Sequence, residues 1–260
     1  MIATSYPVSY LPVLWPDNKL CKPEAVHALT TLINGGVSQR GYSSFNLAAH
    51  VGDDPEAVKT NRLRLMNELQ LPAEPVWLDQ VHSNTVIHAD AIEVSDLRPV
   101  AADASVSSTP GVVCAVLTAD CLPVFFCDQS ASEVAVAHAG WRGLHAGILS
   151  KTIEAMSSPV EQLIANLGPA IGAQSFEVGE DVYQAFADKH ANNKTAFVSN
   201  RKGHYLCDIY QLAKLELQAL GIRQISGGQH CTYSEKEKFY SYRRQPETGR
   251  MASLIWLSQS

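Results

Sequence analysis

The sequence lacks the short metal-binding motifs by which many metalloenzymes can be recognised. Its 260 residues contain no CxxC pair and no HExxH motif, and the nine histidines form no HxH pattern. A multicopper oxidase needs dense HxH patterns and a trigonal site of two histidines and one cysteine. The absence of any HxH pattern therefore argues against a copper-dependent phenol oxidase.

Charge is also scarce, and none of it is concentrated. Charged residues make up 18% of the chain, and the net charge is −6 at pH 7. No cluster of lysine and arginine is long enough to predict a groove for nucleic acid. The partner expected from this composition is a small molecule. If that molecule is an anion, a few local cations must bind it, because the overall field of the protein does not attract it.

Apolar residues are plentiful, but no run of them is long enough to cross a bilayer. The most apolar segment, Gly111 to Cys127, is interrupted by Asp120 and Pro123, whereas a membrane helix needs about 20 apolar residues. The N-terminal segment lacks the basic stretch of a signal peptide and is broken by prolines. We expect a cytoplasmic protein with no membrane partner, whose six cysteines are mostly free thiols.

Hydrophobic residues form 46% of the chain, which supports a substantial core. Cap residues and apolar spacing predict helices over Pro55–Leu69 and Gly143–Met156. Several predicted strands follow one another with no helix between them, which favours a mixed α/β (α+β) sandwich over a doubly wound parallel sheet. No repeat or linker appears, so we expect one domain over residues 1–260. The consecutive strands are Val76–Gln80 and Thr85–Ala89, then Val112–Leu117, Leu122–Cys127 and Val134–Ala137.

The segment from Val112 to Gly143 holds the most reactive side chains. An apolar run ends at Thr118-Ala119-Asp120-Cys121, and a second one ends at His138. If these two strands lie near each other in one sheet, the thiol and the imidazole at their ends converge. A thiolate beside an imidazole can form either a metal site or a nucleophilic site.

His82 is a third candidate for the same site, at a corner between two predicted strands. Two imidazoles and one thiolate suit Zn²⁺, and three protein ligands leave a fourth position open. The separations of 39 and 17 residues between His82, Cys121 and His138 match no local metal motif. The residues therefore leave two interpretations open: a zinc site, or a Cys-His hydrolase with Cys121 as its nucleophile.

Three further groups of side chains could bind an anion, although each also has a purely structural interpretation as a surface charge or ion-pair residue, which is favoured for Arg62. Arg142 is followed by a glycine at the start of a predicted helix, where the helix dipole favours anions. Guanidinium groups also match phosphate oxygens in pairs. The other two groups are Asn46 with His50 and Arg62, and Tyr242-Arg243-Arg244 with Arg250.

Sequence blocks spread over nearly the whole chain make it resemble the YfiH family, whose members are also called polyphenol oxidase or laccase-like proteins and peptidoglycan editing factors. One local departure is Gln174-Ser175-Phe176-Glu177, where some members have a Cys-Cys-Tyr-Glu run, and it affects the pocket wall. The blocks that carry the resemblance are GGVS (Gly35–Ser38), FNLAAHVGDD (Phe45–Asp54), NRLRL (Asn61–Leu65), WLDQVHSN (Trp77–Asn84), ADA (Ala102–Ala104), TADCLPV (Thr118–Val124), AHAGWRG (Ala137–Gly143), GPAIG and FEVG (Gly168–Gly179), and FYSYRR with TGRMAS (Phe239–Ser253).

The resemblance implies a single-domain α/β/β/α sandwich, distantly similar to toxin-type cysteine hydrolases. It implies a catalytic zinc held by His82, Cys121 and His138, with zinc preferred over copper and any catalytic role of Cys121 secondary to its role as ligand. Arg62 matches an arginine that the family uses near phosphate, and we expect Asn46 and Arg142 also to contact phosphate or substrate.

The resemblance further implies phosphorolysis of purine nucleosides (adenosine, inosine, guanosine and methylthioadenosine) and deamination of adenosine. The expected partners are therefore purine nucleosides and phosphate. Two alternatives remain at this stage. One is a metal-independent Cys-His hydrolase that edits peptidoglycan precursors, and the other is the copper-dependent polyphenol oxidase that the laccase label suggests.

Overall fold

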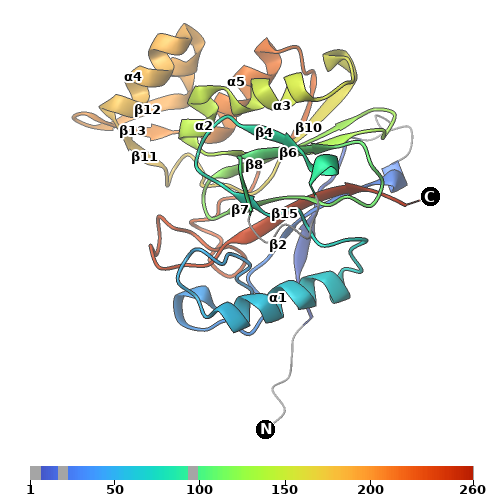
Figure 1. Cartoon of the computed structure of the whole chain (residues 1–260). Helices are drawn as coiled ribbons and strands as arrows, with labels where there is room; N and C mark the ends of the chain where they lie inside the picture. Colours follow the sequence, from blue (N-terminus) through green and yellow to red (C-terminus); the bar gives the residue numbers. More distant parts are fainter. Residues whose placement is uncertain (1–6, 17–22, 93–98, 260) are drawn as a thin grey trace.

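The computed structural model describes residues 7–16, 23–92 and 99–259, so Cys21 lies outside the described residues. Two sheets pack face to face, and helices cover both outer faces (Figure 1). This arrangement confirms the predicted mixed α/β class and the α/β/β/α sandwich. The extent of the domain over residues 1–260 stays a prediction.

The first sheet has four antiparallel strands and is covered by α1 (Pro55–Glu68) on its outer face (Figure 1). Helix α1 begins where the sequence predicts, because the Asp54 side chain accepts a hydrogen bond from the Glu56 backbone N–H and Pro55 occupies the first turn. In spatial order the strands are β1 (Tyr10–Pro12), β2 (Val26–Thr31), β15 (Met251–Leu257) and β7 (Cys114–Thr118).

The second sheet has six strands, and α2 (Trp141–Ala146), α3 (Ile148–Ala155) and α5 (Ile209–Ala219) lie over its outer face (Figure 1). All seven residues of β8 are buried because this strand is covered on both faces, which explains its continuous apolar run. In spatial order the strands are β14 (Gln224–Gly227), β10 (Leu163–Leu167), β8 (Leu122–Asp128), β9 (Val134–Ala139), β6 (Ala104–Ser107) and β4 (Val86–His88).

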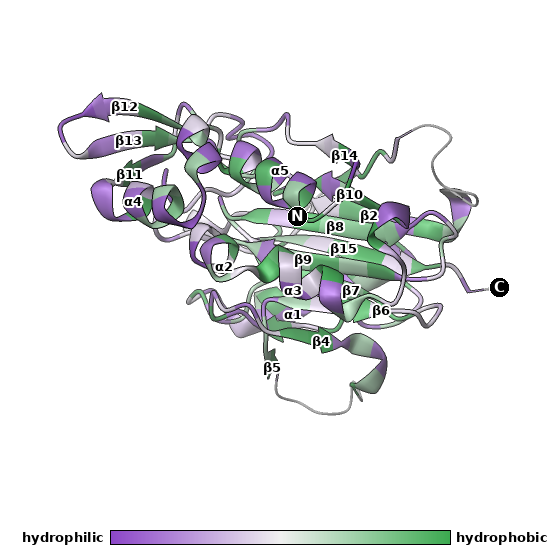
Figure 2. Cartoon of the chain, turned by 90° about the horizontal axis from the view of Figure 1, so that it is seen from above, coloured by the Kyte–Doolittle hydropathy of each residue, from purple (hydrophilic) through white to green (hydrophobic). Residues whose placement is uncertain are grey.

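Side chains alternate between the two faces of each sheet. On β8, Phe125 and Cys127 pack between the sheets, whereas Val124 and Phe126 pack under the helices. On β7, Cys114 and Val116 point to the same space between the sheets. Seen from above, the central strands are largely hydrophobic and the polar residues gather toward the edge near α4 and β12 (Figure 2).

Smaller elements lie at the periphery. Helix α4 (Glu180–Lys189) and a three-stranded sheet extend from one end of the sandwich (Figure 1). Within the described ranges, no helix combines the length and the apolar character needed to cross a membrane. The remaining elements are β11 (Glu177–Gly179), β13 (His204–Cys207), β12 (Phe197–Arg201), the pair β3 (Leu78–Asp79) and β5 (Val100–Ala101), and the 3-10 turns Pro23–Ala25, Arg40–Tyr42, Ala89–Ala91, Val160–Gln162 and Ala191–Ala196.

The prediction of one continuous helix over Gly143–Met156 is wrong. The structure has two short helices here, separated at Gly147, whose φ of 85° is left-handed. The Gly147 backbone N–H donates to the carbonyls of Gly143 and Leu144 and so closes α2. Glycine adopts this conformation readily, which is why the chain changes direction at this residue.

Candidate metal centre and substrate pocket

His82, Cys121 and His138 reach one point from three parts of the fold. Cys121 lies in the turn between β7 and β8. His138 lies inside β9, opposite Pro123 of β8, and not after the end of the strand as predicted. His82 follows β3 and has a left-handed φ of 60°. The three ligand atoms lie within 4.8 Å of one another, so the structure brings the predicted ligands together.

The convergence arises from a pair of strands other than the one predicted. The first apolar run became β7, which belongs to the four-stranded sheet, whereas His138 is on β9 in the six-stranded sheet. It is β8, the strand after Cys121, that pairs with β9. The site therefore forms where the chain crosses from one sheet to the other, at the edge of the space between the sheets.

Asp103 positions two of the three side chains. Its Oδ1 lies 2.8 Å from His138 Nδ1 and accepts a 3.0 Å hydrogen bond from the His82 backbone N–H. Its Oδ2 accepts from the backbone N–H and the hydroxyl of Ser83. Asp103 is fully buried. Because it occupies Nδ1 of His138, Nε2 is the nitrogen left to face a metal, the arrangement usual for zinc-bound histidines.

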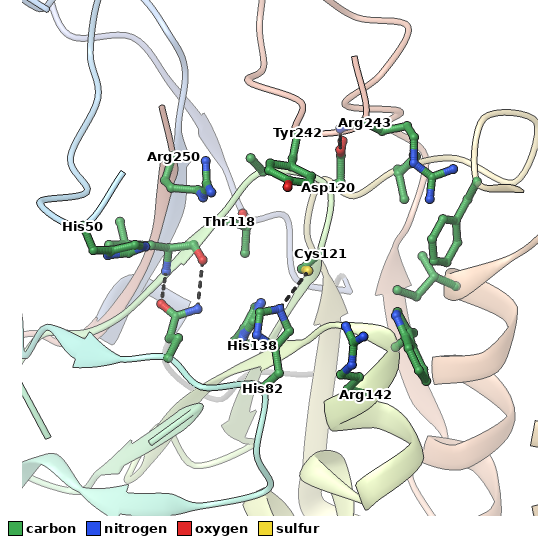
Figure 3. Close-up of a pocket in the computed structure, with 17 residues that line it drawn as sticks. His50, His82, Thr118, Asp120, Cys121, His138, Arg142, Tyr242, Arg243 and Arg250 are labelled. Atoms are coloured by element: carbon green, nitrogen blue, oxygen red, sulfur yellow. Dashed lines mark hydrogen bonds between the residues drawn. The ribbon is translucent and has the colours of Figure 1, made fainter. Parts of the chain in front are cut away.

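Gly140 provides the space in which the side chains meet. A Cβ atom at this position would lie 3.0 Å from Cys121 Sγ and 3.3 Å from His82 Cδ2. Cys121 Sγ and His82 Nε2 are 4.0 Å apart (Figure 3), and the His82 and His138 rings meet edge to face at 4.8 Å between centroids.

The thiol and the imidazole shift each other's protonation. Burial favours the neutral thiol, but the charge of His138 and hydrogen bonds from His138 and His82 outweigh burial and lower the pKa of Cys121 to about 6. Burial also opposes charge on His138, yet the Cys121 thiolate and the bond to Asp103 raise the pKa of His138 to about 9. Near pH 7 without metal, the two groups form a thiolate–imidazolium pair.

The donor set fits a catalytic metal ion. Zinc accepts two imidazoles and one thiolate, and three protein ligands leave one position for water or substrate. Copper accepts the same donor types. Among the described residues, these three form the one cluster with the spacing of metal ligands.

A cavity of about 430 Å³ surrounds this cluster. One part of its wall is apolar and aromatic and includes Trp141, Ile171, Phe176 and Ile209. Three arginines line the same cavity: Arg142, Arg243 and Arg250. The three potential ligands, His82, Cys121 and His138, are called the metal cluster below. In Figure 3, Arg250 and His50 lie on one side of it, and Arg142 and Arg243 lie on the other.

The predicted anion ligands are divided by the fold. Arg142 lines the cavity and stacks over the Trp141 ring at 4.5 Å. It lies on α2, which has only six residues, so the helix dipole expected to favour an anion here is weak. Arg62 lines a different cavity, where it stacks over Trp77 at 4.1 Å and donates to the Leu47 carbonyl. The structure does not bring Arg62 to the metal cluster.

Asn46 also lies outside the cavity that holds the metal cluster. It is fully buried, and its side chain donates to the Ala48 carbonyl and to Asp53 while accepting from the backbone N–H groups of Ala48 and Arg250. All its polar atoms are used in this network. Asn46 therefore holds the backbone of Arg250 in place and has no atom free for substrate.

Asp103 and Asp120 are two residues of the site that sequence patterns did not reveal. Asp120 is 9% exposed, and its carboxylate accepts from the Thr232 hydroxyl, the Ser241 hydroxyl and the Arg243 backbone N–H. It ties the loop that carries Arg243 to the turn that carries Cys121. Both aspartates lie within family blocks, but their partners are distant in sequence, so spacing could not reveal them.

Comparisons with known proteins cover nearly the whole chain. Residues 27–258 match a family model described as "Multi-copper polyphenol oxidoreductase laccase". The chain is 50% identical to a purine nucleoside phosphorylase of Pseudomonas aeruginosa over 94% of its own length and 96% of that protein. It is equally similar, at 50%, to the purine nucleoside phosphorylase YfiH of Escherichia coli, with the same coverage.

Solved structures show the same fold. A Neisseria meningitidis protein of the DUF152 family model superposes with a TM-score of 0.90 at 47% identity, covering 96% of this chain and 100% of that chain. The Bacillus licheniformis protein YfiH superposes with a TM-score of 0.87 at 29% identity, covering 95% of this chain and 97% of that chain.

Proposed function

This chain belongs to the family described as multi-copper polyphenol oxidoreductase laccase, and we propose that it is a zinc-dependent purine nucleoside phosphorylase. One observation carries the proposal: a single cavity joins a His-Cys-His cluster to three arginines and an aromatic wall. The names of the relatives with 50% identity support the same activity.

The three predicted ligands would hold the metal through His82 Nε2, Cys121 Sγ and His138 Nε2. Bound zinc supplies a positive charge that polarises substrate atoms and makes water more acidic. Zinc is preferred to copper because this cluster of two histidines and one cysteine offers a single site, whereas multicopper oxidases need several sites rich in histidine. Asp103 fixes the tautomer and orientation of His138.

The rest of the cavity is suited to a nucleoside and phosphate. In phosphorolysis an oxygen of hydrogen phosphate bonds to C1′ of the ribose while the C1′–N9 bond breaks, and the proton lost by phosphate ends on the departing base. Arginines neutralise the phosphate dianion and orient it. Phe176 and Trp141 offer aromatic faces against which a purine can stack. The expected substrates are adenosine, inosine, guanosine and methylthioadenosine.

Deamination of adenosine is the second activity included in the proposal. In this reaction water replaces the amino group at C6 of the purine. The amino group leaves as ammonia. The cluster offers three protein ligands, so a metal held there would keep one position for water, which metal-assisted hydrolysis needs. A cytoplasmic location is also included, because a reducing compartment keeps the Cys121 thiolate available.

The Cys-His hydrolase is retained as a second candidate function. A specific observation favours it: Cys121, His138 and Asp103 form a thiolate–imidazolium–carboxylate series, with the pKa of Cys121 lowered to about 6. Such a pair resembles the activated nucleophile of cysteine hydrolases. This candidate requires no metal.

The test measures the release of purine base from inosine by the purified, zinc-loaded protein, with and without phosphate. Phosphorylase activity predicts free hypoxanthine only when phosphate is present, and its loss after chelation. Adenosine is assayed in parallel for inosine. Absence of both products from the zinc-loaded protein would refute the proposal. Activity that survives chelation but is abolished by thiol alkylation would favour the hydrolase.

A further inference from the structure

We propose that Thr118 and Arg250, with His50 beside them, form the phosphate subsite of this cavity. This inference rests on the proposed function, which requires phosphate and nucleoside to bind together. It assigns the phosphate to one side of the metal cluster and the purine base to the other.

Thr118 provides the first observation. It is the last residue of β7, it lines the cavity, and it is only 1% exposed. Its hydroxyl is buried and has no hydrogen-bond partner among the described residues. A buried hydroxyl without a partner costs free energy that a ligand would recover. The hydroxyl is therefore a donor available to an oxygen-rich ligand.

The strand register places Arg250 beside the end of β7, and Arg250 lines the same cavity as Thr118. Met251, the first residue of β15, pairs with Thr118, so Arg250 is adjacent to that pair. Nη1 of Arg250 donates to the carbonyls of Thr248 and Gly249, and Asn46 holds its backbone N–H. These hydrogen bonds and the Tyr242 ring, 5.9 Å from the guanidinium carbon, hold the guanidinium. No hydrogen bond among the described residues uses its Nη2. Figure 3 shows Arg250, His50 and Thr118 on the same side of His138 and Cys121.

The position of Arg250 is electrostatically suited to an anion near the metal cluster. Burial lowers the pKa of Arg250, and the Cys121 thiolate opposes this effect. Burial and the charges of Arg250 and Arg62 lower the pKa of His50, and Asp79 opposes them. This direction favours the neutral ring, which can donate one N–H. A fixed cation, a hydroxyl and an imidazole N–H match the oxygens of one phosphate.

The other two arginines occupy the opposite side. Arg142 stacks on the Trp141 ring, and Arg243 lies over the Phe176 ring and donates to the Glu177 carbonyl. Both are exposed. A displacement at C1′ places the entering oxygen and the departing base on opposite sides of that carbon. The aromatic side with Arg142 and Arg243 therefore suits the base, and the side with Thr118 and Arg250 suits phosphate.

The experiment titrates inorganic phosphate into the zinc-loaded protein by calorimetry and measures KM for phosphate and for inosine. Thr118→Val removes the hydroxyl at constant shape, Thr118→Ser restores it, and Arg250→Gln removes the charge. Arg223→Gln, an exposed arginine outside the cavity, is the matched control. Arg250→Lys replaces Arg250→Gln if the latter does not fold.

We expect Thr118→Val and Arg250→Gln each to weaken phosphate binding by about tenfold or more, the scale of one hydrogen bond to a charged group. KM for inosine should change by less than about threefold, and Thr118→Ser should recover most of the phosphate affinity. Unchanged phosphate affinity in Thr118→Val and Arg250→Gln, or a rise in KM for inosine alone, overturns the subsite. If the wild-type protein binds phosphate, loses that binding in both variants, and yet releases no base, the proposed function fails while the subsite stands.

Discussion

Two cavities on this chain hold arginines beside aromatic rings, but they differ in what else they contain. The cavity of about 430 Å³ holds the His-Cys-His cluster and Arg250. The cavity of about 610 Å³ lies against α1 and holds Arg62 over Trp77, with Lys59 and Glu74 on its wall. Among the described residues that line the larger cavity there is no thiol and no histidine.

The difference shows that the type of side chain alone does not identify a reactive site. Arg62 and Arg250 are both partly buried and both held by backbone carbonyls. Only Arg250 is close enough for the Cys121 thiolate to influence its pKa. Proximity to a metal cluster is therefore the property that separates the two arginines.

The largest effect should come from removing the thiolate of the first cavity. Cys121→Ala removes one of the three ligands, so we expect metal content and phosphate-dependent base release both to fall to background. Cys231→Ala is the matched control, because Cys231 is also partly exposed and lies outside the metal cluster. Elemental analysis and an assay of hypoxanthine release measure the two outcomes. Full zinc content in Cys121→Ala would contradict the ligand assignment.

The next largest effect should come from Asp103. Asp103→Asn removes the charge that orients His138 and holds the His82 loop, so we expect zinc affinity to fall by about 10- to 100-fold. A competition titration with a zinc chelator measures it. Asp90→Asn is the control, since Asp90 also accepts bonds from nearby serines but lies away from the cavity. Equal affinities in the two variants would show that Asp103 has no role at the metal.

A smaller effect, visible only without metal, should appear in how the alkylation rate of Cys121 depends on pH. Its pKa of about 6 predicts that alkylation of the metal-free protein is half-maximal near pH 6, whereas burial raises the pKa of Cys127 and Cys207 and keeps them unreactive. Rates of iodoacetamide modification, followed by mass spectrometry, test this. A midpoint near pH 9 would mean that no thiolate–imidazolium pair forms.

The same pair links stability to pH in the metal-free protein. The lowered pKa of Cys121 contributes stability that is complete above its ordinary value of 9.0 and is lost as the pH falls through about 6. The raised pKa of His138 contributes stability that is complete below 6.5 and is lost as the pH rises through about 9. Between about pH 6.5 and 9 the Cys121 contribution rises while the His138 contribution falls, so the two offset each other. Thermal unfolding of the metal-free protein should therefore give a Tm that changes little over this range.

The smallest effect should come from Arg62. Arg62→Gln removes the stacking on Trp77, worth about 0.5–1 kcal/mol at a partly exposed site, and the bond to the Leu47 carbonyl. We expect a small fall in Tm and a change in KM for phosphate below that of Arg250→Gln. If Arg62→Gln raises KM for phosphate as much, phosphate recognition extends to the second cavity and the contrast between the two arginines disappears.

Much of the fold and the identity of the family were predictable from the sequence. The cap of α1 and the buried strand β8 follow from local patterns, and the resemblance to YfiH is confirmed by relatives that bear this name. The helix over Gly143–Met156 was wrong because the left-handed turn at Gly147 has no clear local signal. An isolated glycine is tolerated in a helix and does not by itself predict a break.

The sequence by itself determined which reactive side chains are present: the thiol, the two imidazoles and the arginines. It also determined the apolar strands next to them. The tertiary structure alone decided which of these meet. Strand pairing placed Cys121 against β9 and set Arg250 beside Thr118, while α1 carried Arg62 to another cavity. The physical reason is that sheet register and packing between layers join residues outside any local sequence window, more than a hundred positions apart in the case of Thr118 and Met251, and no local pattern records those pairings.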